Sequence, residues 1–249
     1  MHTDSDTLGQ TAIVTGASRG LGLGIARRLG AAGHRVVLAA REPETLEAAR
    51  EQLGDGAIAV PTDVTSHADV ERLVATTIEH FGSVELLVNA AATVPVLDPL
   101  ETLTLHRFRR GFDTDVFGTL LVSQRVAPHM RTQGRGMIVN LIAARGGTIA
   151  GPAHLSVSPS QAALLALTQS LAVILGSDGI TVHAVFPRLS PDGETGRTAA
   201  PALGVTFDGS QPTADDVGAA VVELLSRHES AAWSMSAEGI LAVADSVAA

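Results

Sequence analysis

The sequence predicts an α/β fold, in which a single doubly wound domain holds a parallel sheet of about seven strands with helices on both faces. Two observations carry this prediction. Short apolar runs with strand character alternate with helical patterns from one end of the chain to the other, which is typical of βαβ units. In addition, 249 residues with 45% apolar and 17% charged side chains can bury one large core. Residues 1–249 show no linker or internal repeat and are expected to form one domain.

The strand-like runs are short, apolar and bounded by polar or glycine residues. Strands are expected at residues 11–15, 35–39, 57–60, 86–88, 137–141, 180–185 and 240–243. Helical spacing fills the segments between them, at residues 21–29, 42–53, 66–81, 103–132, 160–175 and from 213 onward. Gly54 ends the second helix, Ser66 is the expected N-cap of the third, and Thr213 with Asp216 forms a capping box for the last. Residues 187–212, rich in Gly, Pro, Ser and Thr, are expected to form a lid on the substrate side.

Composition excludes several classes of function. The net charge of −9 disfavours nucleic acid and anionic membranes as partners. The absence of cysteine excludes disulfides, thiolate nucleophiles and zinc–thiolate sites. Residues 1–10 lack the apolar core of a signal peptide, and no apolar run reaches the length of a membrane span. We therefore expect a soluble cytoplasmic protein.

A glycine-rich turn joins the first strand to the first helix. Gly16, Gly20 and Gly22 let the backbone approach a pyrophosphate, and the helix N-terminus offers free N–H groups to it. The motif Thr-Gly-X-X-X-Gly-X-Gly resembles the loop of the short-chain dehydrogenase/reductase family, whose Rossmann-type members transfer hydride between NAD(P)H and a carbonyl. The resemblance extends from Thr11 to about Val243 and implies NADP(H) as cofactor.

Further positions match the family's cofactor pattern. Arg41 follows the second strand, where an arginine suits the 2′-phosphate of NADP, although it is also readily explained as a surface residue. Asp63 and Val64 resemble the family's adenine-contacting pair, and Asn89 is either the first residue of its Asn-Asn-Ala-Gly segment or a strand-end turn residue. The expected cofactor set is Gly16, Ser18, Arg19, Gly20, Leu21, Gly22, Arg41, Asp63, Val64 and Asn89.

The residues that stand at the family's catalytic positions differ in this chain. Family enzymes use an Asn, a Ser, a Tyr and a Lys, yet this chain contains no tyrosine, and its 17 basic residues are all arginine. In the family pattern, the Asn position is taken here by Asp115, the Ser position by Ala143 or Ala144, the Tyr position by Val157 and the Lys position by Gln161. A general acid typically raises the reaction rate about 10²–10⁴-fold, and a hydrogen-bond donor at the developing oxyanion raises it about 10²–10³-fold. We therefore expect no family ketoreductase activity and name no catalytic residue.

The resemblance also implies changes where the nicotinamide of the cofactor would bind. Arg188 stands where family members have a glycine, and Asp192 lies near the position of the Thr that contacts the cofactor phosphates in the family. A new site could combine polar residues around the cleft, although Asp115 is better explained by a bond to Gln161 or to a backbone amide, and His154 by a plain loop role. Arg188 either binds an anion or fills vacated space. The candidates are Asp115, Arg145, His154, Ser156, Ser158 and Arg188. No histidine spacing indicates a metal site.

Three hypotheses of function follow. The first is a repurposed enzyme for non-redox chemistry on a small molecule, such as cyclisation, isomerisation or dehydration. The second is a catalytically silent subunit that assembles with an active relative. The third is an NADP(H)-dependent oxidoreductase with a non-standard proton donor, either water or His154. The helix at 160–175 is apolar nearly all round, and the resemblance implies dimers or tetramers through it and the 103–132 helix. The alternative is that the chain's own loops cover it.

Overall fold

The computed structural model describes residues 9–93, 99–142, 155, 157–185 and 214–230. Six strands lie in this part: β1 (Thr11–Thr15), β2 (Arg35–Ala40), β3 (Ala57–Pro61), β4 (Leu86–Asn89), β5 (Gly136–Leu141) and β6 (Ile180–Val185). The helices are α1 (Gly20–Ala31), α2 (Pro43–Glu51), α3 (His67–Phe81), α4 (Leu105–Gly111), η1 (Phe112–Gly118), α5 (Thr119–Gln133), α6 (Ser158–Gly176) and α7 (Ala214–Ser230).

The strands form one parallel sheet in the order β3-β2-β1-β4-β5-β6. The predicted α/β class, the parallel sheet and the alternation of strands with helices are confirmed. The predicted seventh strand at 240–243 and the lid at 187–212 lie outside the described residues, as does Thr213 of the proposed capping box.

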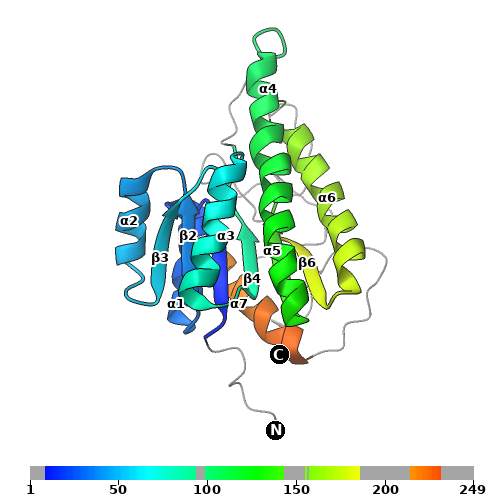
Figure 1. The fold of residues 1–249 in the computed structure, drawn as a ribbon. Helices are drawn as coiled ribbons and strands as arrows, with labels where there is room; N and C mark the ends of the chain where they lie inside the picture. The colour runs from blue at the N-terminus through cyan, green and yellow to red at the C-terminus, as the bar shows by residue number, and fades with distance from the viewer. Residues whose placement is uncertain (1–8, 94–98, 143–154, 156, 186–213, 231–249) are drawn as a thin grey trace, which may run out of the picture.

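Helices cover both faces of the sheet (Figure 1). Successive residues of a strand point to opposite faces, so Val36 and Leu38 of β2 pack on the side of α1 and α7, while Val37 packs on the side of α3 and α5. Each face buries a continuous apolar cluster, and this double burial explains why the strands read as uninterrupted apolar runs.

The segment 103–132, predicted as one long helix, is divided by a π-helical stretch. The α-helix α4 passes into η1 and then into α5 without leaving the helical path. Gly118, at the end of η1, approaches Val64, because a Cβ at Gly118 would lie 2.7 Å from a Val64 methyl carbon. The predicted long helix at 103–132 is therefore confirmed as one continuous helical path, and the π-helical stretch within it is a feature that the sequence pattern did not indicate.

Helix α6 buries one side and exposes the other in the single chain. Leu164, Ala172 and Leu175 are buried, whereas Val173 is 69% and Ile174 63% exposed. By length and composition α6 is also the one described helix apolar enough to cross a membrane. It packs here against β6 and η1, as the core helix of a globular domain does.

Candidate functional site

The carboxyl ends of β1 and β4 mark the point where the sheet changes direction. The chain runs outward from β1 to β3 on one side and from β4 to β6 on the other. In doubly wound sheets ligands bind in the crevice at such a switch point. Four segments of the predicted site follow strands on this edge, namely the glycine loop after β1, Arg41 after β2, Asp63 after β3 and Asn89 at the end of β4.

Gly16 begins the glycine loop in a conformation that requires glycine. Its φ is +66°, and a Cβ there would lie 2.8 Å from the Ala90 carbonyl oxygen and from the Ala91 nitrogen. Thr15 secures the same junction, because its Oγ1 accepts hydrogen bonds of 3.1 Å from the N–H groups of Ala90 and Ala91. The loop after β1 and the segment after β4 are therefore held together across the switch point.

Helix α1 presents an open N-terminus beside this loop. Arg19, its N-cap residue, makes no side-chain capping bond, and the first turn contains no acidic residue. The first N–H groups of a helix lack intrahelical partners and attract anions. Within the described residues the N-cap side chain does not satisfy them, so in this part of the chain they are open to a phosphate group.

Two arginines lie at the same edge without partners among the described residues. Arg19 in the loop and Arg41 just past β2 are both exposed, and neither forms an ion pair in that part of the chain. In a protein of net charge −9, these two exposed arginines place two positive charges at this edge of the sheet. Positive charge there favours an additional phosphate on the ligand.

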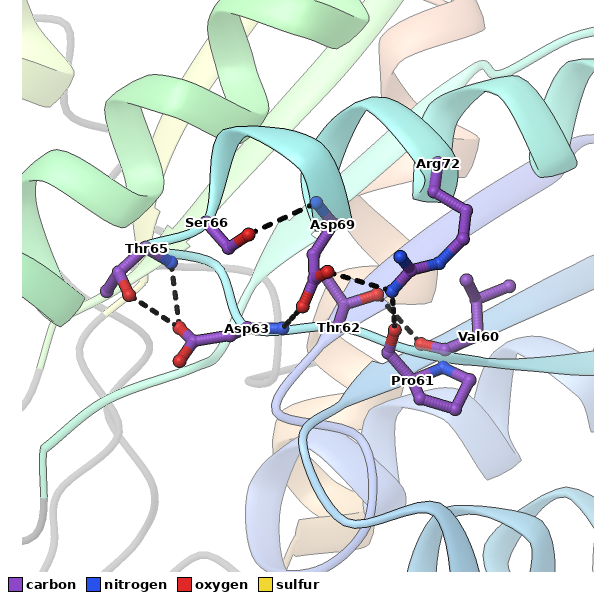
Figure 2. Close-up of polar contacts among 8 residues, drawn as sticks. All are labelled: Val60, Pro61, Thr62, Asp63, Thr65, Ser66, Asp69 and Arg72. Atoms are coloured by element: carbon purple, nitrogen blue, oxygen red, sulfur yellow. Dashed lines mark hydrogen bonds and ion pairs between the residues drawn. The ribbon is translucent and has the colours of Figure 1, made fainter.

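The segment after β3 is held by a dense set of hydrogen bonds (Figure 2). Asp63 Oδ1 accepts bonds from the N–H and the hydroxyl of Thr65, at 2.9 and 2.7 Å. The Asp63 N–H donates to Asp69 Oδ2 at 2.9 Å. Val64 is buried and packs toward η1. Asp63 and Val64 therefore occupy a fixed turn rather than a loose loop.

Asn89 belongs to a buried chain of polar side chains. Its Nδ2 donates to Asn140 Oδ1 at 2.9 Å and to Ser123 Oγ at 3.3 Å. Asn140 Nδ2 in turn donates to Thr168 Oγ1 at 2.9 Å. These bonds connect β4 to β5, α5 and α6 beneath the switch point. Because the Asn89 amide is only 4% exposed, its side chain serves the interior of the protein in this structure.

Asp115 is completely buried in η1 and is surrounded by donors. Its Oδ1 accepts from the Thr93 N–H at 2.9 Å, and its Oδ2 accepts from Ser160 Oγ at 2.7 Å and from Gln161 Nε2 at 2.8 Å. Burial raises the pKa of this carboxyl above its ordinary value, and the three hydrogen bonds oppose that shift. The interpretation that Asp115 binds Gln161 or a backbone amide is confirmed for both partners.

Val157 and Gln161 lie one helical turn apart at the start of α6. Val157 is 3% exposed, and its carbonyl oxygen accepts from Ser160 Oγ at 2.8 Å. Gln161 is 1% exposed and reaches toward η1, where Asp115 holds its amide. The structure thus brings Asp115, Val157 and Gln161 together, as the family resemblance implies for these positions.

Several predicted positions cannot be placed, because they fall outside the described residues. These are Ala143, Ala144, Arg145, His154, Ser156, Arg188 and Asp192. Ser158 begins α6 and is partly exposed. Among the described residues, no cluster of three or more His, Asp or Glu could hold a metal ion.

Sequence reasoning missed three residues that shape this edge. Thr15 could have been found, because it is the last residue of a strand and precedes the glycine loop. Ser160 could not, because only the fold brings it to Asp115. Asp69 stands three residues after Ser66, a spacing that predicts a helix cap. Its bond to Asp63 extends beyond that motif.

Comparison with curated proteins finds close similarity over most of the chain. The family model described as short chain dehydrogenase matches residues 10–191. The 2-(R)-hydroxypropyl-CoM dehydrogenase of Xanthobacter autotrophicus is 38% identical over 186 residues, covering 72% of this chain and 74% of the relative. The sorbitol dehydrogenase of Cereibacter sphaeroides is 37% identical over 188 residues, covering 75% and 72%.

Solved structures show the same likeness over a larger part of the chain. The 3-ketoacyl-(acyl-carrier-protein) reductase of Brucella melitensis, complexed with NADH, aligns with a TM-score of 0.78 at 25% identity over 88% of this chain and 91% of that one. A metagenomic short-chain oxidoreductase in complex with NADP aligns with a TM-score of 0.74 at 25% identity, over 95% and 96%.

Proposed function

This chain belongs to the short-chain dehydrogenase family, and from that premise we propose that it binds NADP(H) at the β1–β4 switch point but does not carry out the family's hydride transfer. The observation that carries this proposal is the complete absence of tyrosine and lysine from the 249 residues. We propose that its activity is non-redox chemistry on a small molecule, such as cyclisation, isomerisation or dehydration.

Retention of the cofactor is supported by the geometry of the loop. Gly16 has the close backbone approach that a pyrophosphate loop needs, and the open N-terminus of α1 supplies donors for phosphate oxygens. Related structures hold NADH or NADP. Arg19 and Arg41 would bind the 2′-phosphate of NADP(H), and Asp63 would accept a hydrogen bond from the adenine. When bound, the nicotinamide would supply hydride chemistry only if a proton source stood beside it.

Loss of the ordinary proton source is supported by the residues at the reactive positions. Val157 has an aliphatic side chain, which can neither donate a proton nor bond a carbonyl oxygen. Gln161 is neutral, and its amide is bound to Asp115. Asp115 has both oxygens occupied and no exposed surface. Without a general acid the family reaction loses about 10²–10⁴-fold in rate.

A second candidate is a catalytically silent subunit that assembles with an active relative. The exposed apolar residues Val173 and Ile174 on α6 favour it, as do exposed Phe117 and Leu120 on η1 and α5, the helical segment that packs against α6. A third candidate, an oxidoreductase with another proton donor, is favoured by the dehydrogenase activity named for the relatives.

Calorimetric titration with NADPH, run beside NADH, tests the proposal. We expect NADPH to bind in the micromolar range and NADH to bind more weakly, because only NADPH offers the 2′-phosphate to Arg19 and Arg41. Failure to bind either nucleotide would contradict the cofactor part of the proposal and would favour the silent subunit.

A further inference from the structure

We infer that Asp69 and Arg72 are positioning residues for the adenine end of the nucleotide site, because together they fix the backbone at Asp63, from which its carboxylate projects. This inference rests on the proposed NADP(H) binding. Neither residue is expected to touch the cofactor, since both act through Asp63.

Asp69 departs from the usual capping pattern in a specific way. In a capping box, the third helical residue accepts a bond from the N–H of the N-cap residue. Ser66 fills its half of that pattern, since its Oγ accepts from the Asp69 N–H at 3.3 Å. The Ser66 N–H, however, donates to the Asp63 carbonyl oxygen at 2.9 Å. The Asp69 carboxylate therefore accepts a hydrogen bond not from the N-cap residue but from the Asp63 N–H, at 2.9 Å.

Arg72 fixes Asp69 from the next turn of α3 (Figure 2). One of its Nη atoms donates to Asp69 Oδ1 at 3.0 Å and to the Pro61 carbonyl oxygen at 2.8 Å. The two side chains therefore form a bracket from the first turns of α3 to the end of β3. The bond from Asp63 and the Arg72 guanidinium lower the pKa of the Asp69 carboxyl, so that it stays ionised in mildly acidic solution.

This bracket fixes the turn at Asp63 and leaves one oxygen of the Asp63 carboxylate oriented as a hydrogen-bond acceptor. The N–H, the carbonyl oxygen and the Oδ1 of Asp63 are all bound within the turn. Its Oδ2 accepts no hydrogen bond from the described part of the chain, and the side chain is partly exposed. An oriented carboxylate oxygen of this kind matches the exocyclic amino group of adenine, which is a donor, and it rejects the oxo group of hypoxanthine, which is an acceptor.

The test measures discrimination between two cofactors that differ only at the Watson–Crick edge of the base, where hypoxanthine has a 6-oxo group and N1–H in place of the 6-amino group and unprotonated N1 of adenine. NADPH and its hypoxanthine analogue, deamino-NADPH, are titrated calorimetrically against the full chain. We expect the wild type to bind NADPH about tenfold more tightly than the analogue. In Asp69→Ala this ratio should fall to about twofold or less, and Asp69→Asn, which retains an oxygen acceptor, should restore most of it.

Two control variants separate positioning from simple stability. Ser66→Ala removes the cap of the same helix, and Glu71→Ala removes an exposed carboxylate of α3 that has no bonding partner among the described residues. Both should keep the wild-type ratio, although Ser66→Ala should lower the melting temperature. Should Asp69→Ala fail to fold, Arg72→Met loosens the same bracket and should lower the ratio.

The possible failures are distinguishable. Absence of NADPH binding by the wild type would overturn the proposed function and this inference with it. NADPH binding without preference over the analogue, or a preference that survives Asp69→Ala and Arg72→Met unchanged, would overturn this inference alone.

Discussion

Asp115 places a carboxylate where the family resemblance expects an asparagine, and the surrounding structure accommodates it. Three donors surround its two oxygens, and no part of the residue is exposed. A buried carboxylate with these bonds links η1 to α6. Its protonation state therefore bears on the stability of the fold more than on proton transfer to a ligand.

The raised pKa of Asp115 predicts a pH-dependent stability. Between 3.8, the ordinary value, and the raised value in the folded protein, the folded state binds more protons than the unfolded state. The free energy of unfolding of the wild type, relative to Asp115→Asn, should therefore increase as the pH falls from about 7 to about 4.5. Urea unfolding of both proteins across this range measures it. A difference that stays constant with pH would show that the pKa of Asp115 is not raised.

Arg41 should determine the choice between the two nicotinamide cofactors. Arg41→Ala removes the charge proposed to meet the 2′-phosphate, so the Kd for NADPH should rise about tenfold while that for NADH changes little. Arg125→Ala, which removes an exposed arginine from α5, is the matched control. Equal weakening of both cofactors by Arg41→Ala would contradict a role in recognising the 2′-phosphate.

At the scale of elements, the glycine loop and the end of β4 approach each other closely through their backbones. Gly16 and Gly54 both have positive φ, at +66° and +77°, but only Gly16 faces neighbouring backbone. Gly54→Ala should cost about 1 kcal/mol in the free energy of unfolding, from backbone strain alone. Gly16→Ala should cost about 2–4 kcal/mol and abolish NADPH binding, because overpacking adds to the strain. Chemical unfolding measures both, and equal costs would contradict the close approach.

The sequence predicts the elements well because most strands are buried along their length and most helices bury one apolar side. The strand at 35–39 and the Ser66 cap illustrate this, since both depend on local pattern and on burial. The π-helical turns of η1 were missed, because the contacts of Gly118 with Val64 and of Asp115 with Ser160 are long-range. At the site, the pairing of Asp115 with Gln161 could be expected from the family positions. The reach of Asp69 to Asp63 could not, because the same spacing also fits an ordinary cap.

At the scale of the whole molecule, the exposed side of α6 and the neighbouring helical segment predict self-association. Val173, Ile174, Phe117 and Leu120 expose apolar surface that water disfavours. The double variant Val173→Glu/Ile174→Glu should shift the protein from an oligomer to a monomer in analytical ultracentrifugation. Leu100→Glu, at an equally exposed leucine before α4, should leave the oligomer intact. A monomeric wild type would contradict assembly through these helices.

We propose that this chain keeps the nucleotide site of its family while lacking the acid that completes carbonyl reduction. Oxidation of NADPH by the purified wild type, followed by absorbance against a panel of ketones and aldehydes, tests it most directly. The triple variant Ala143→Ser/Val157→Tyr/Gln161→Lys is measured beside it. We expect the wild type to oxidise NADPH no faster than the buffer control, and the triple variant to gain a measurable rate. Turnover by the wild type at an ordinary enzymatic rate, about 1 s⁻¹ or more, would show that the protein has a working proton donor.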